Sequence, residues 1–579
     1  MRQYARKEKA MKMSLLEVKC VSSLSKVFPD SECMEEEYTC GSALRGEVFS
    51  FQAAYRAERM VKGLHVEVDT GALKVQPQVR RVGLAPSEMP TYGGGDDFVL
   101  RDTPGLYPDP LFPVSPAEEI YAYPGQWRSI WVTLSVPEDA KEGSYPIRIR
   151  ISGTDDPYEE SGREWYGEQL FTLQVLPGKL PKSKLFHTEW FAADCISTWY
   201  GLSPLTPAWW EMIRAYVKNA AEHGINMLLT PLFTPPLDTR IGGERPTVQL
   251  MEITRADGRY DFDFENLGKW VSMAKEEGIE YFEIPHLFTQ WGAKFTPKII
   301  VRENGEEKKL FGWHVESESR EYLDFLEQLL PKLIDYLKTY VREDQIFFHV
   351  SDEPKNDSLE RYGRLSKVVK RHIGDCPVID ALSDYELFEK SLLTSPVTAV
   401  DSVDPFFRKN VKNMWVYYCC AQYQNCVPNR FFAMPSSRNR ILGMLMYKYN
   451  IQGFLHWGYN FWYSGLSVKK LNPFLDTDGD GSFPSGDAFL VYPGGNGPVN
   501  SIRMEVLREA FQDYSALCLL ESLVGREEAM KLLEEGIPPL TFQQYPREKE
   551  WLLGTRGRIN EKIKDALYTC GQPVAGSER

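Results

Sequence analysis

Two adjacent carboxylates, Asp352 and Glu353, end an apolar, β-rich run that starts at Ile346, and Pro354 follows them. Proline has no N–H for a strand ladder and restricts the residue before it. We therefore expect the strand to stop near Glu353, with both acids at its carboxyl end. Barrel enzymes place catalytic groups at such strand ends. In the alternative interpretation, the acids form a solvated turn or cap a helix that begins near Asp357.

A carboxylate pair in a barrel mouth is typical of glycoside hydrolysis. Consecutive strand residues point to opposite sides, so Asp352 and Glu353 do not straddle a glycosidic bond as do the carboxyls of an ordinary retaining enzyme, about 5–5.5 Å apart. A nucleophile supplied by the substrate, such as the carbonyl oxygen of a 2-acetamido group, fits better. In that scheme Glu353 is the general acid and base, and Asp352 orients and polarises the amide.

The composition is that of a packed globular protein. The chain has 579 residues, 43% of them hydrophobic and 26% charged, and its length predicts roughly two to four domains. Its 67 basic and 81 acidic residues give a net charge of -14, which opposes binding to nucleic acid. Ten cysteines lack a paired C-x-x-C framework, so neither a disulfide scaffold nor structural zinc is expected.

We expect no targeting segment at the start of the sequence. Met1–Met13 is basic but has no apolar core followed by a small-residue cleavage site, and no run of about 18 apolar residues occurs. We therefore expect a soluble cytoplasmic enzyme, with unconventional export left open. We expect no membrane partner, no metal and no cofactor.

The first third of the chain contains short segments in which apolar and polar residues alternate, separated by Gly, Pro and Asp. Examples are Glu47–Tyr55, Leu64–Asp69, Ser129–Val136 and Tyr145–Ile151. Alternation at this spacing indicates a β-sandwich, which we assign to residues 14–178. Two prolines and three lysines within 177–184 then predict a linker.

Apolar runs next alternate with helix-like segments such as Trp209–His223 and Tyr322–Tyr340. This alternation predicts a (β/α)₈ barrel over residues 184–500, in which the acid pair ends the fourth strand. The sixth run is short, and its flanking helices are poorly marked. The eight β-runs are Leu185–Trp190, Ile225–Thr230, Ile279–Ile284, Ile346–Ser351, Val378–Leu382, Val397–Val400, Met414–Tyr418 and Gly453–Trp457.

Residues 501–579 are mostly helical in pattern, as in Arg503–Leu520 and Glu527–Glu535. We expect them to form a helical appendage packed on the barrel. The predicted fold class is therefore α/β: an N-terminal β-sandwich, a (β/α)₈ barrel and a C-terminal helical segment.

Several separated motifs in one order resemble glycoside hydrolase family 123, the β-N-acetylgalactosaminidase-like enzymes, and a broader set of related domains. They are Arg45–Gln52 in the sandwich, then Val350–Pro354, Gly453–Trp462, Gly486–Gly494 and Ser501–Ala510. The resemblance spans most of the chain. It implies a sandwich-plus-barrel architecture, retaining substrate-assisted hydrolysis of terminal β-linked N-acetylgalactosamine in a glycan or glycoconjugate, and catalytic roles for Asp352 and Glu353.

Other side chains near strand ends are candidates for sugar contact. Trp457 and Asn460 follow the eighth strand, where an indole supports a sugar face and an amide donates to hydroxyls. Tyr417 and Tyr418 end the seventh strand with opposite facings, so one of them reaches the pocket, and we choose Tyr418 to hold the acetamido carbonyl. A structural role is the alternative for the remaining candidates, His187, His286 and Trp291.

An acidic loop, Asp476-x-Asp478-x-Asp480-Gly481, has part of a calcium-loop pattern, with Asp487 at the twelfth position. The usual terminal Glu is absent, Pro484 interrupts the run and no helix is predicted before it. We interpret the segment as an acidic turn.

Three competing functions are considered. The first is an ordinary two-carboxylate glycosidase, in which Glu283, Asp380 or Asp384 acts with Glu353. The second is a carbohydrate-binding protein without turnover, and the third is a metal-dependent hydrolase. The choice between galacto- and gluco-configured N-acetylhexosamine depends on one or two pocket contacts and is left open by the sequence.

Overall fold

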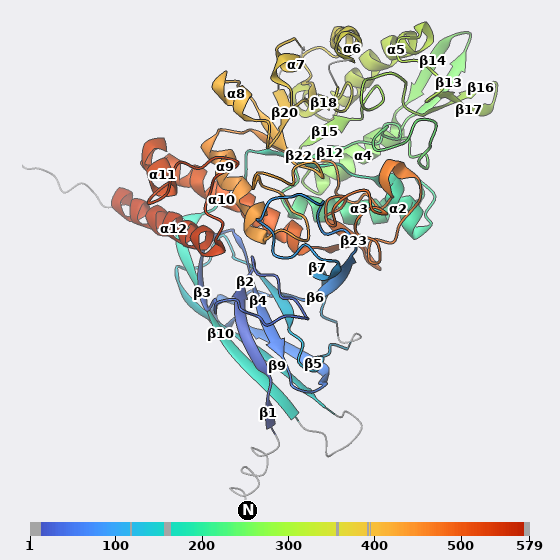
Figure 1. The fold of residues 1–579 in the computed structure, drawn as a ribbon. Coiled ribbons are helices and arrows are strands. Elements are labelled where there is room, and N and C mark those ends of the chain that lie inside the picture. The colour runs from blue at the N-terminus through green and yellow to red at the C-terminus, as the bar shows by residue number, and fades with distance from the viewer. Residues whose placement is uncertain are drawn as a thin grey trace, which may run out of the picture.

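The computed structural model describes residues 13–115, 119–155, 164–354, 358–390, 393 and 395–571. Its parts are a β-sandwich, a parallel barrel with surrounding helices, and C-terminal helices that contact both (Figure 1). The predicted fold class is confirmed. The domain boundaries derived from the sequence stay predictions, and Asp357 lies outside the described residues.

The sandwich consists of two sheets. Buried Ile147, Ile149 and Ile151 alternate with outward-facing Arg148 and Arg150 on β9, which is the period-two pattern predicted from the sequence. One sheet has the order β2 (Glu17–Ser22), β4 (Val48–Arg56), β8 (Arg128–Ser135), β6 (Gln78–Ser87), β7 (Gly105–Pro113). The other has the order β1 (Met13–Leu15), β10 (Glu164–Lys179), β9 (Gly143–Thr154), β5 (Lys62–Asp69), with β3 (Cys40–Arg45) also paired to β10.

All eight predicted barrel strands form, including the short sixth one. Neighbouring strands are parallel, and a bridge between Phe348 and Val378 brings the fourth and fifth strands together. Aromatic side chains fill the interior, where Phe186 stacks on Trp415 with ring centroids 5.0 Å apart. The strands are β11 (Phe186–Glu189), β12 (Met227–Leu229), β15 (Tyr281–Ile284), β18 (Ile346–Phe348), β19 (Ile379–Ala381), β20 (Ser395–Ala399), β21 (Trp415–Tyr417) and β22 (Gly453–His456).

Helices surround the barrel, and the two predicted from periodicity are confirmed as α3 and α5. The α5 helix buries one apolar stripe, which includes Phe325, Leu329 and Leu333, and the Ser319 side chain accepts the Tyr322 N–H at its start. Before the C-terminal segment the helices are α2 (Ala193–Tyr200), α3 (Pro207–Glu222), α4 (Glu265–Glu276), α5 (Arg320–Leu337), α6 (Leu359–His372), α7 (Tyr385–Lys390), α8 (Asp404–Arg408) and α9 (Ser436–Lys448).

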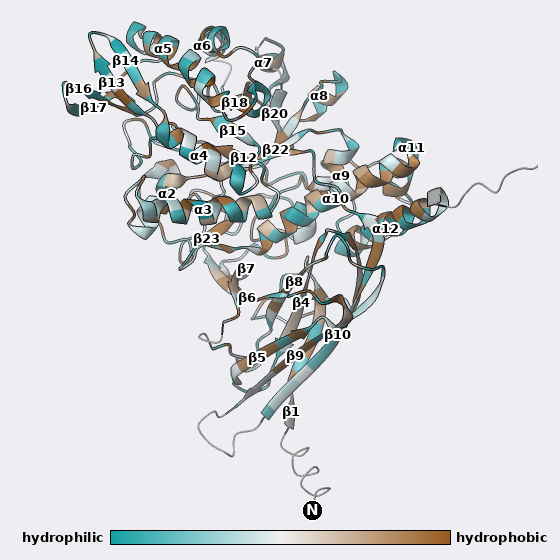
Figure 2. Cartoon of the chain, turned by 180° about the vertical axis from the view of Figure 1, so that it is seen from behind, coloured by the Kyte–Doolittle hydropathy of each residue, from teal (hydrophilic) through white to brown (hydrophobic). Residues whose placement is uncertain are grey.

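Hydrophilic and hydrophobic residues mix along these helices (Figure 2). Across the described ranges, no helix combines the length and the apolar character needed to cross a membrane.

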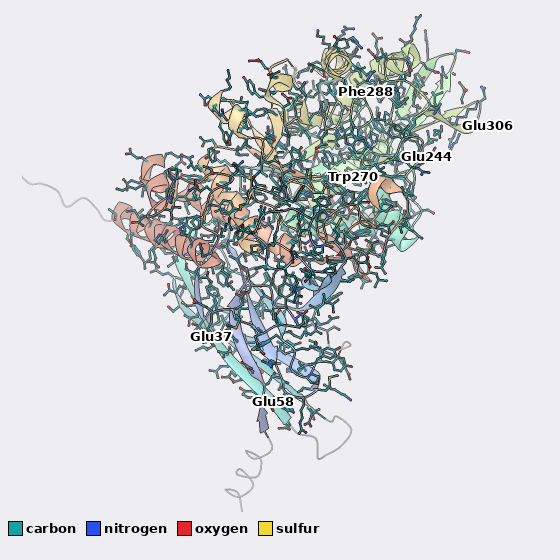
Figure 3. All side chains as sticks on the ribbon, viewed as in Figure 1. Glu37, Glu58, Glu244, Trp270, Phe288 and Glu306 are labelled. Carbon is teal, nitrogen blue, oxygen red and sulfur yellow. The ribbon has the colours of Figure 1, made fainter. Side chains whose placement is uncertain are left out.

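Two hairpins that the sequence analysis missed form a separate four-stranded sheet beside the barrel. Glu306 lies at its outer end (Figure 3). Their turns are Asp257-Gly258 and Asn304-Gly305, and all four residues have positive φ, between 50° and 84°. Such dipeptides are strong hairpin signals, so the hairpins were predictable from local sequence. The strands are β13 (Glu252–Ala256), β14 (Arg259–Asp263), β16 (Ile299–Glu303) and β17 (Glu306–Phe311).

A small hairpin, β23 (Val491–Pro493) and β24 (Pro498–Asn500), leads to the C-terminal helices α10 (Ile502–Val524), α11 (Arg526–Leu533) and α12 (Lys549–Gly571). The α10 helix follows the last barrel strand and packs on α9. It therefore occupies the position of the eighth barrel helix. The two helices approach closely at Gly443, where an added Cβ would lie 1.7 Å from the Ala510 carbonyl oxygen. The α12 helix packs on both α10 and the sandwich strand β10.

A buried ion network joins these helices to the sandwich. Arg440 on α9 donates to Asp513 and Glu509 on α10, at 2.8 Å each. Arg556 on α12 donates to Asp513 at 2.7 Å and to Glu47, which precedes β4, at 2.6 Å. Since these side chains are buried, each charge would destabilise the fold without its oppositely charged partners.

Asp513→Ala leaves Arg440 and Arg556 without their shared carboxylate. We expect the free energy of unfolding to fall by about 3–5 kcal/mol, because an incompletely paired charge stays buried. Chemical denaturation measures the change. The control Glu307→Ala breaks an exposed pair with Arg302 and should have little effect. Equal losses in the two variants would contradict the role given to the network.

Candidate active site

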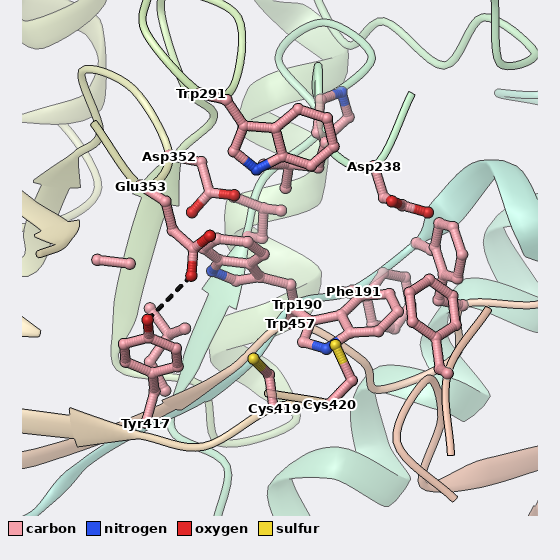
Figure 4. Close-up of a pocket in the computed structure, with 18 of the residues that line it drawn as sticks. Trp190, Phe191, Asp238, Trp291, Asp352, Glu353, Tyr417, Cys419, Cys420 and Trp457 are labelled. Atoms are coloured by element: carbon pink, nitrogen blue, oxygen red, sulfur yellow. Dashed lines mark hydrogen bonds between the residues drawn. The ribbon is translucent and has the colours of Figure 1, made fainter. Parts of the chain in front are cut away.

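A pocket with a volume of about 160 Å³ opens at the carboxyl ends of the barrel strands (Figure 4). Asp352 and Glu353 lie on one side of it. Apolar pockets with a few converging polar groups are typical ligand sites. The aromatic lining residues are Trp190, Phe191, Trp291, Tyr417, Trp457, Phe461 and Phe483, and the other polar ones are Asp238, Arg245, Cys419 and Cys420.

The acid pair lies beyond the paired part of its strand. Regular pairing stops at Phe348, not near Glu353 as expected. The cause is Asp380, whose two carboxylate oxygens each accept the N–H of Val350 at 3.1 Å, so this N–H has no strand partner. Further along, Glu353 has a φ of 42°. This left-handed conformation is costly for a residue with a side chain and is common at functional sites.

The two carboxyls influence each other. Burial, followed by the charges of Glu353 and Asp380, holds the pKa of Asp352 well above its usual range. Adjacent carboxyls in one site share a proton more readily than they ionise together. Tyr417 donates its hydroxyl to Glu353 Oε1 at 2.9 Å. The raised pKa of Asp352 therefore favours its protonated form in the absence of substrate.

The tyrosine at the pocket is Tyr417, and this corrects the choice of Tyr418. The Tyr418 side chain is buried on the other side of the strand and donates to Asn439 Oδ1 at 2.9 Å. The expectation of opposite facings was right. Which residue faces inward is decided by Trp415, which occupies the barrel interior and places Tyr417 on the same side.

Trp291 and Trp457 line the pocket, where the sequence analysis expected them. Trp291 is 46% exposed and follows β15 at the rim. The Trp457 indole donates to Asp487 Oδ2 at 3.0 Å and packs between Phe461 and Phe483, with centroids 5.0 Å from each. Both indoles can offer a flat apolar face to a sugar ring.

Three predicted contact residues lie outside the pocket and have structural partners instead. Asn460 accepts the N–H of Ala192 at 2.8 Å and donates to its carbonyl at 3.1 Å. His187 faces α10, where its ring packs edge-on against Phe511. His286 is buried, with its ring stacked on His349.

Asp238 is a pocket residue that the sequence analysis missed. It follows β12 and lies across the pocket from the acid pair (Figure 4). Its Oδ2 accepts the Leu466 N–H at 2.9 Å, and burial raises its pKa to about 6. The sequence gives only a weak indication of this role, because Asp238 lies in a loop at some distance beyond the end of its strand.

The carboxylates of the ordinary two-carboxylate alternative have other partners. Glu283 and Asp380 are fully buried, and His349 bridges them. Asp384 lines an adjoining cavity with Glu353, and its Oδ1 accepts the Glu386 N–H at the start of α7, at 2.8 Å.

Within the part of the chain that the structure describes, one cluster brings three potential metal ligands together, His286, His349 and Asp380. The two imidazole rings stack with centroids 4.3 Å apart and planes inclined by 22°, so their nitrogens do not converge on one ion. Both nitrogens of His349 already face carboxylates. The geometry is that of an ion-pair network.

In the acidic loop the carboxylates point to separate partners. Asp478 accepts the N–H groups of Met89 and Gly481, and Asp480 pairs with Lys469 at 2.7 Å. Asp487 is buried and holds Trp457. These contacts fit the interpretation as an acidic turn that supports the pocket wall.

Comparisons with known proteins identify the family. The model of the glycoside hydrolase 123 catalytic domain matches residues 190–520. The chain belongs to glycoside hydrolase family 123. A family 123 glycoside hydrolase from Clostridium perfringens, described in connection with glycolipid glycan hydrolysis, has a similar structure, with a TM-score of 0.70 and 14% identity over 96% of this chain and 98% of that one.

Two other solved structures, a PapD-like domain of human CEP192 and the Escherichia coli chaperone DraB, have TM-scores of only 0.14 and 0.15. Their identities are 10% and 8%, over 28% and 43% of this chain and 87% and 68% of theirs. A comparison with curated proteins gave no match. As a family 123 member, the chain is a glycoside hydrolase, and its substrate is a glycan.

The adjacent tyrosines provide a matched test of the site. Tyr417→Phe removes the hydrogen bond to Glu353, and we expect kcat on a glycoside substrate to fall by about 10-fold to 100-fold. Tyr418→Phe removes a buried bond to Asn439, so it should lower stability by about 1 kcal/mol and leave kcat unchanged. Steady-state kinetics and thermal unfolding measure both. The reverse pattern would show that Tyr418 is the pocket residue.

Proposed function

We propose that the chain removes terminal β-linked N-acetylgalactosamine by retaining hydrolysis, with the substrate's 2-acetamido group as the nucleophile. The observation that carries this proposal is the acid pair, which offers two carboxyls from one loop at one side of the pocket. Glu283 and Asp380, two of the carboxylates an ordinary mechanism would use, are bound in a buried network. The choice of sugar rests on the motifs that resemble family 123 enzymes.

The first step forms a bond within the substrate. The acetamido carbonyl oxygen attacks the anomeric carbon, the glycosidic C–O bond breaks, and Glu353 gives its proton to the leaving oxygen. Asp352 accepts the amide N–H and stabilises the positive charge that develops on the resulting oxazolinium ring. In the second step, water gives a proton to Glu353 and attacks the same carbon, the bond from that carbon to the amide oxygen breaks, and the 2-acetamido group is restored. Two inversions restore the original configuration.

These roles require the shared proton to move when substrate binds. Without substrate, burial and the charges of Glu353 and Asp380 favour the protonated form of Asp352. An acetamido N–H that points at Asp352 favours the ionised form of that carboxyl, so the proton passes to Glu353. Binding of the correct amide thus prepares the acid for the leaving group.

A second candidate mechanism has a specific basis in Asp238. Its carboxylate lines the pocket opposite the acid pair, where it could attack the anomeric carbon as an ordinary nucleophile while Glu353 acts as the acid. In our proposal, Asp238 instead accepts hydrogen bonds from sugar hydroxyls. The two roles differ in whether catalysis needs the acetamido group.

Glu353→Gln removes the proton donor while keeping the shape of the side chain. We expect kcat/KM for a nitrophenyl β-N-acetylgalactosaminide to fall by about 10²-fold to 10⁴-fold. The loss should be smaller with a dinitrophenyl leaving group, which departs without a proton. Asp352→Asn should lose activity equally with both leaving groups. An identical dependence on the leaving group in the two variants would contradict the assigned roles. Comparing the wild-type activity on the galacto- and gluco-configured substrates tests the choice of sugar.

A thiazoline analogue of N-acetylgalactosamine imitates the cyclic intermediate. If the substrate's amide is the nucleophile, we expect this compound to inhibit at least 10²-fold more tightly than the free sugar binds. Inhibition constants measure the difference, and a galactose analogue without the amide is the control. Asp238→Asn should retain the reaction with a raised KM. Two results together would instead support Asp238 as the nucleophile. In that case Asp238→Ala abolishes turnover and azide restores it, and the thiazoline binds only weakly.

A further inference from the structure

His349 is the first residue after β18 and is completely buried. Its ring bridges carboxylates from two other strands. Nε2 lies 2.8 Å from Glu283 Oε2 on β15, and Nδ1 lies 3.3 Å from Asp380 Oδ1 on β19. A ring with an acceptor at both nitrogens is satisfied only as the doubly protonated imidazolium. Burial lowers the pKa of His349, but the hydrogen bonds to Asp380 and Glu283 outweigh burial and raise it to about 9.

The two carboxylates hold different parts of the pocket. Asp380 accepts the N–H groups of Val350 at 3.1 Å and Ser351 at 3.5 Å, immediately before the acid pair. Glu283 accepts the indole N–H of Trp190, a pocket-wall residue, at 3.0 Å. His349 therefore connects the loop that carries the acids with the pocket-wall residue Trp190.

The surroundings of His349 contain a second imidazole with different chemistry. His286 stacks on His349, and Trp190 meets both rings edge-on, with centroids 5.1 Å and 5.8 Å away. Burial, and then the charge of His349, hold the pKa of His286 well below its usual value, so His286 is neutral. Among the described residues, neither of its ring nitrogens has a hydrogen-bond partner. The stack therefore pairs one charged ring with one neutral ring of the same shape.

We propose that His349 is a positioning residue whose imidazolium holds the acid loop against Trp190 and favours the ionised form of Asp352 during catalysis. This inference rests on the proposed function, in which Asp352 must be ionised to accept the acetamido N–H. Glu283, Asp380 and His286 contact His349, and Tyr362 on α6 donates to Asp380 at 2.7 Å. The positive charge of His349 also acts on Asp352, whose pKa it lowers.

The sign of the effect follows from the charges. The cation opposes burial and Glu353, which both raise the pKa of Asp352. Loss of the cation therefore moves the ionisation of Asp352 to higher pH. The folded-state pKa of His349, about 9, lies above its unfolded value of about 6.5. Its stabilising contribution is therefore complete below about pH 6.5 and is lost as the pH rises through about 9.

The stacked rings allow a matched experiment with the same substitution at neighbouring positions, His349→Gln and His286→Gln. The readout is the pH profile of kcat/KM with a nitrophenyl β-N-acetylgalactosaminide. The acidic limb reports loss of the first proton from the coupled pair of carboxyls in the free enzyme. We expect His349→Gln to move this limb upward by about one pH unit, because the nearby cation is lost, and His286→Gln to leave it in place. A structural role alone would lower the rate without moving the limb. An unmoved limb in His349→Gln, or an equal shift in both variants, overturns the proposal.

A second measurement covers the case in which His349→Gln does not fold. Carbon-13 NMR of labelled histidine rings in the full wild-type chain should show, for His349, an imidazolium at pH 7.5 that titrates near pH 9. Glu283→Gln, which removes one of its two partners, should lower that pKa. A neutral His349 at pH 7.5 overturns the inference regardless of substrate. Absence of hydrolysis with every N-acetylhexosaminide would overturn the proposed function, while the NMR result would still decide the charge of His349.

Discussion

The candidate site depends on a buried carboxylate that binds the backbone. Asp380 accepts the N–H of Val350 with both oxygens, in the place where a neighbouring strand would otherwise supply a carbonyl. The chain consequently leaves the sheet after Phe348 and carries Asp352 and Glu353 into the pocket. Burying this charge is costly, and hydrogen bonds from His349 and Tyr362 offset the cost. The short strand β18 and the left-handed backbone of Glu353 fit the same constraint.

The electrostatics of the pocket distinguish two neighbouring carboxyls by their surroundings. Asp352 is affected mainly by burial and nearby negative charge, whereas Glu353 receives a hydrogen bond from Tyr417. In the mechanism we propose, an incoming amide reverses the resulting proton preference. A pair of this kind responds to the substrate, because a small change in hydrogen bonding decides which carboxyl holds the proton.

The remainder of the molecule keeps the pocket in shape. Loops after several barrel strands supply the walls, and each wall residue has its own support, such as Asp487 for Trp457 and Glu283 for Trp190. The α10 helix closes the barrel against α9, and α12 ties that region to the sandwich through Arg556 and Asp513. The sandwich thus stabilises the barrel from outside and contributes no residue to the pocket lining among the described residues.

The sequence by itself determined the elements. Alternating and continuous apolar runs predicted the sandwich and all eight barrel strands, because such periodicity reflects local burial. Pro354 predicted a strand end near Glu353, but the strand ends at Phe348 and the acid pair lies in the loop beyond it. The hairpin turns at Asp257-Gly258 and Asn304-Gly305 were also predictable from the local sequence. Only the tertiary structure decided that Tyr417 faces inward, that Asn460 and His187 are structural, and that Asp238 reaches the pocket. Those outcomes depend on contacts between residues far apart in the chain, which no local pattern records.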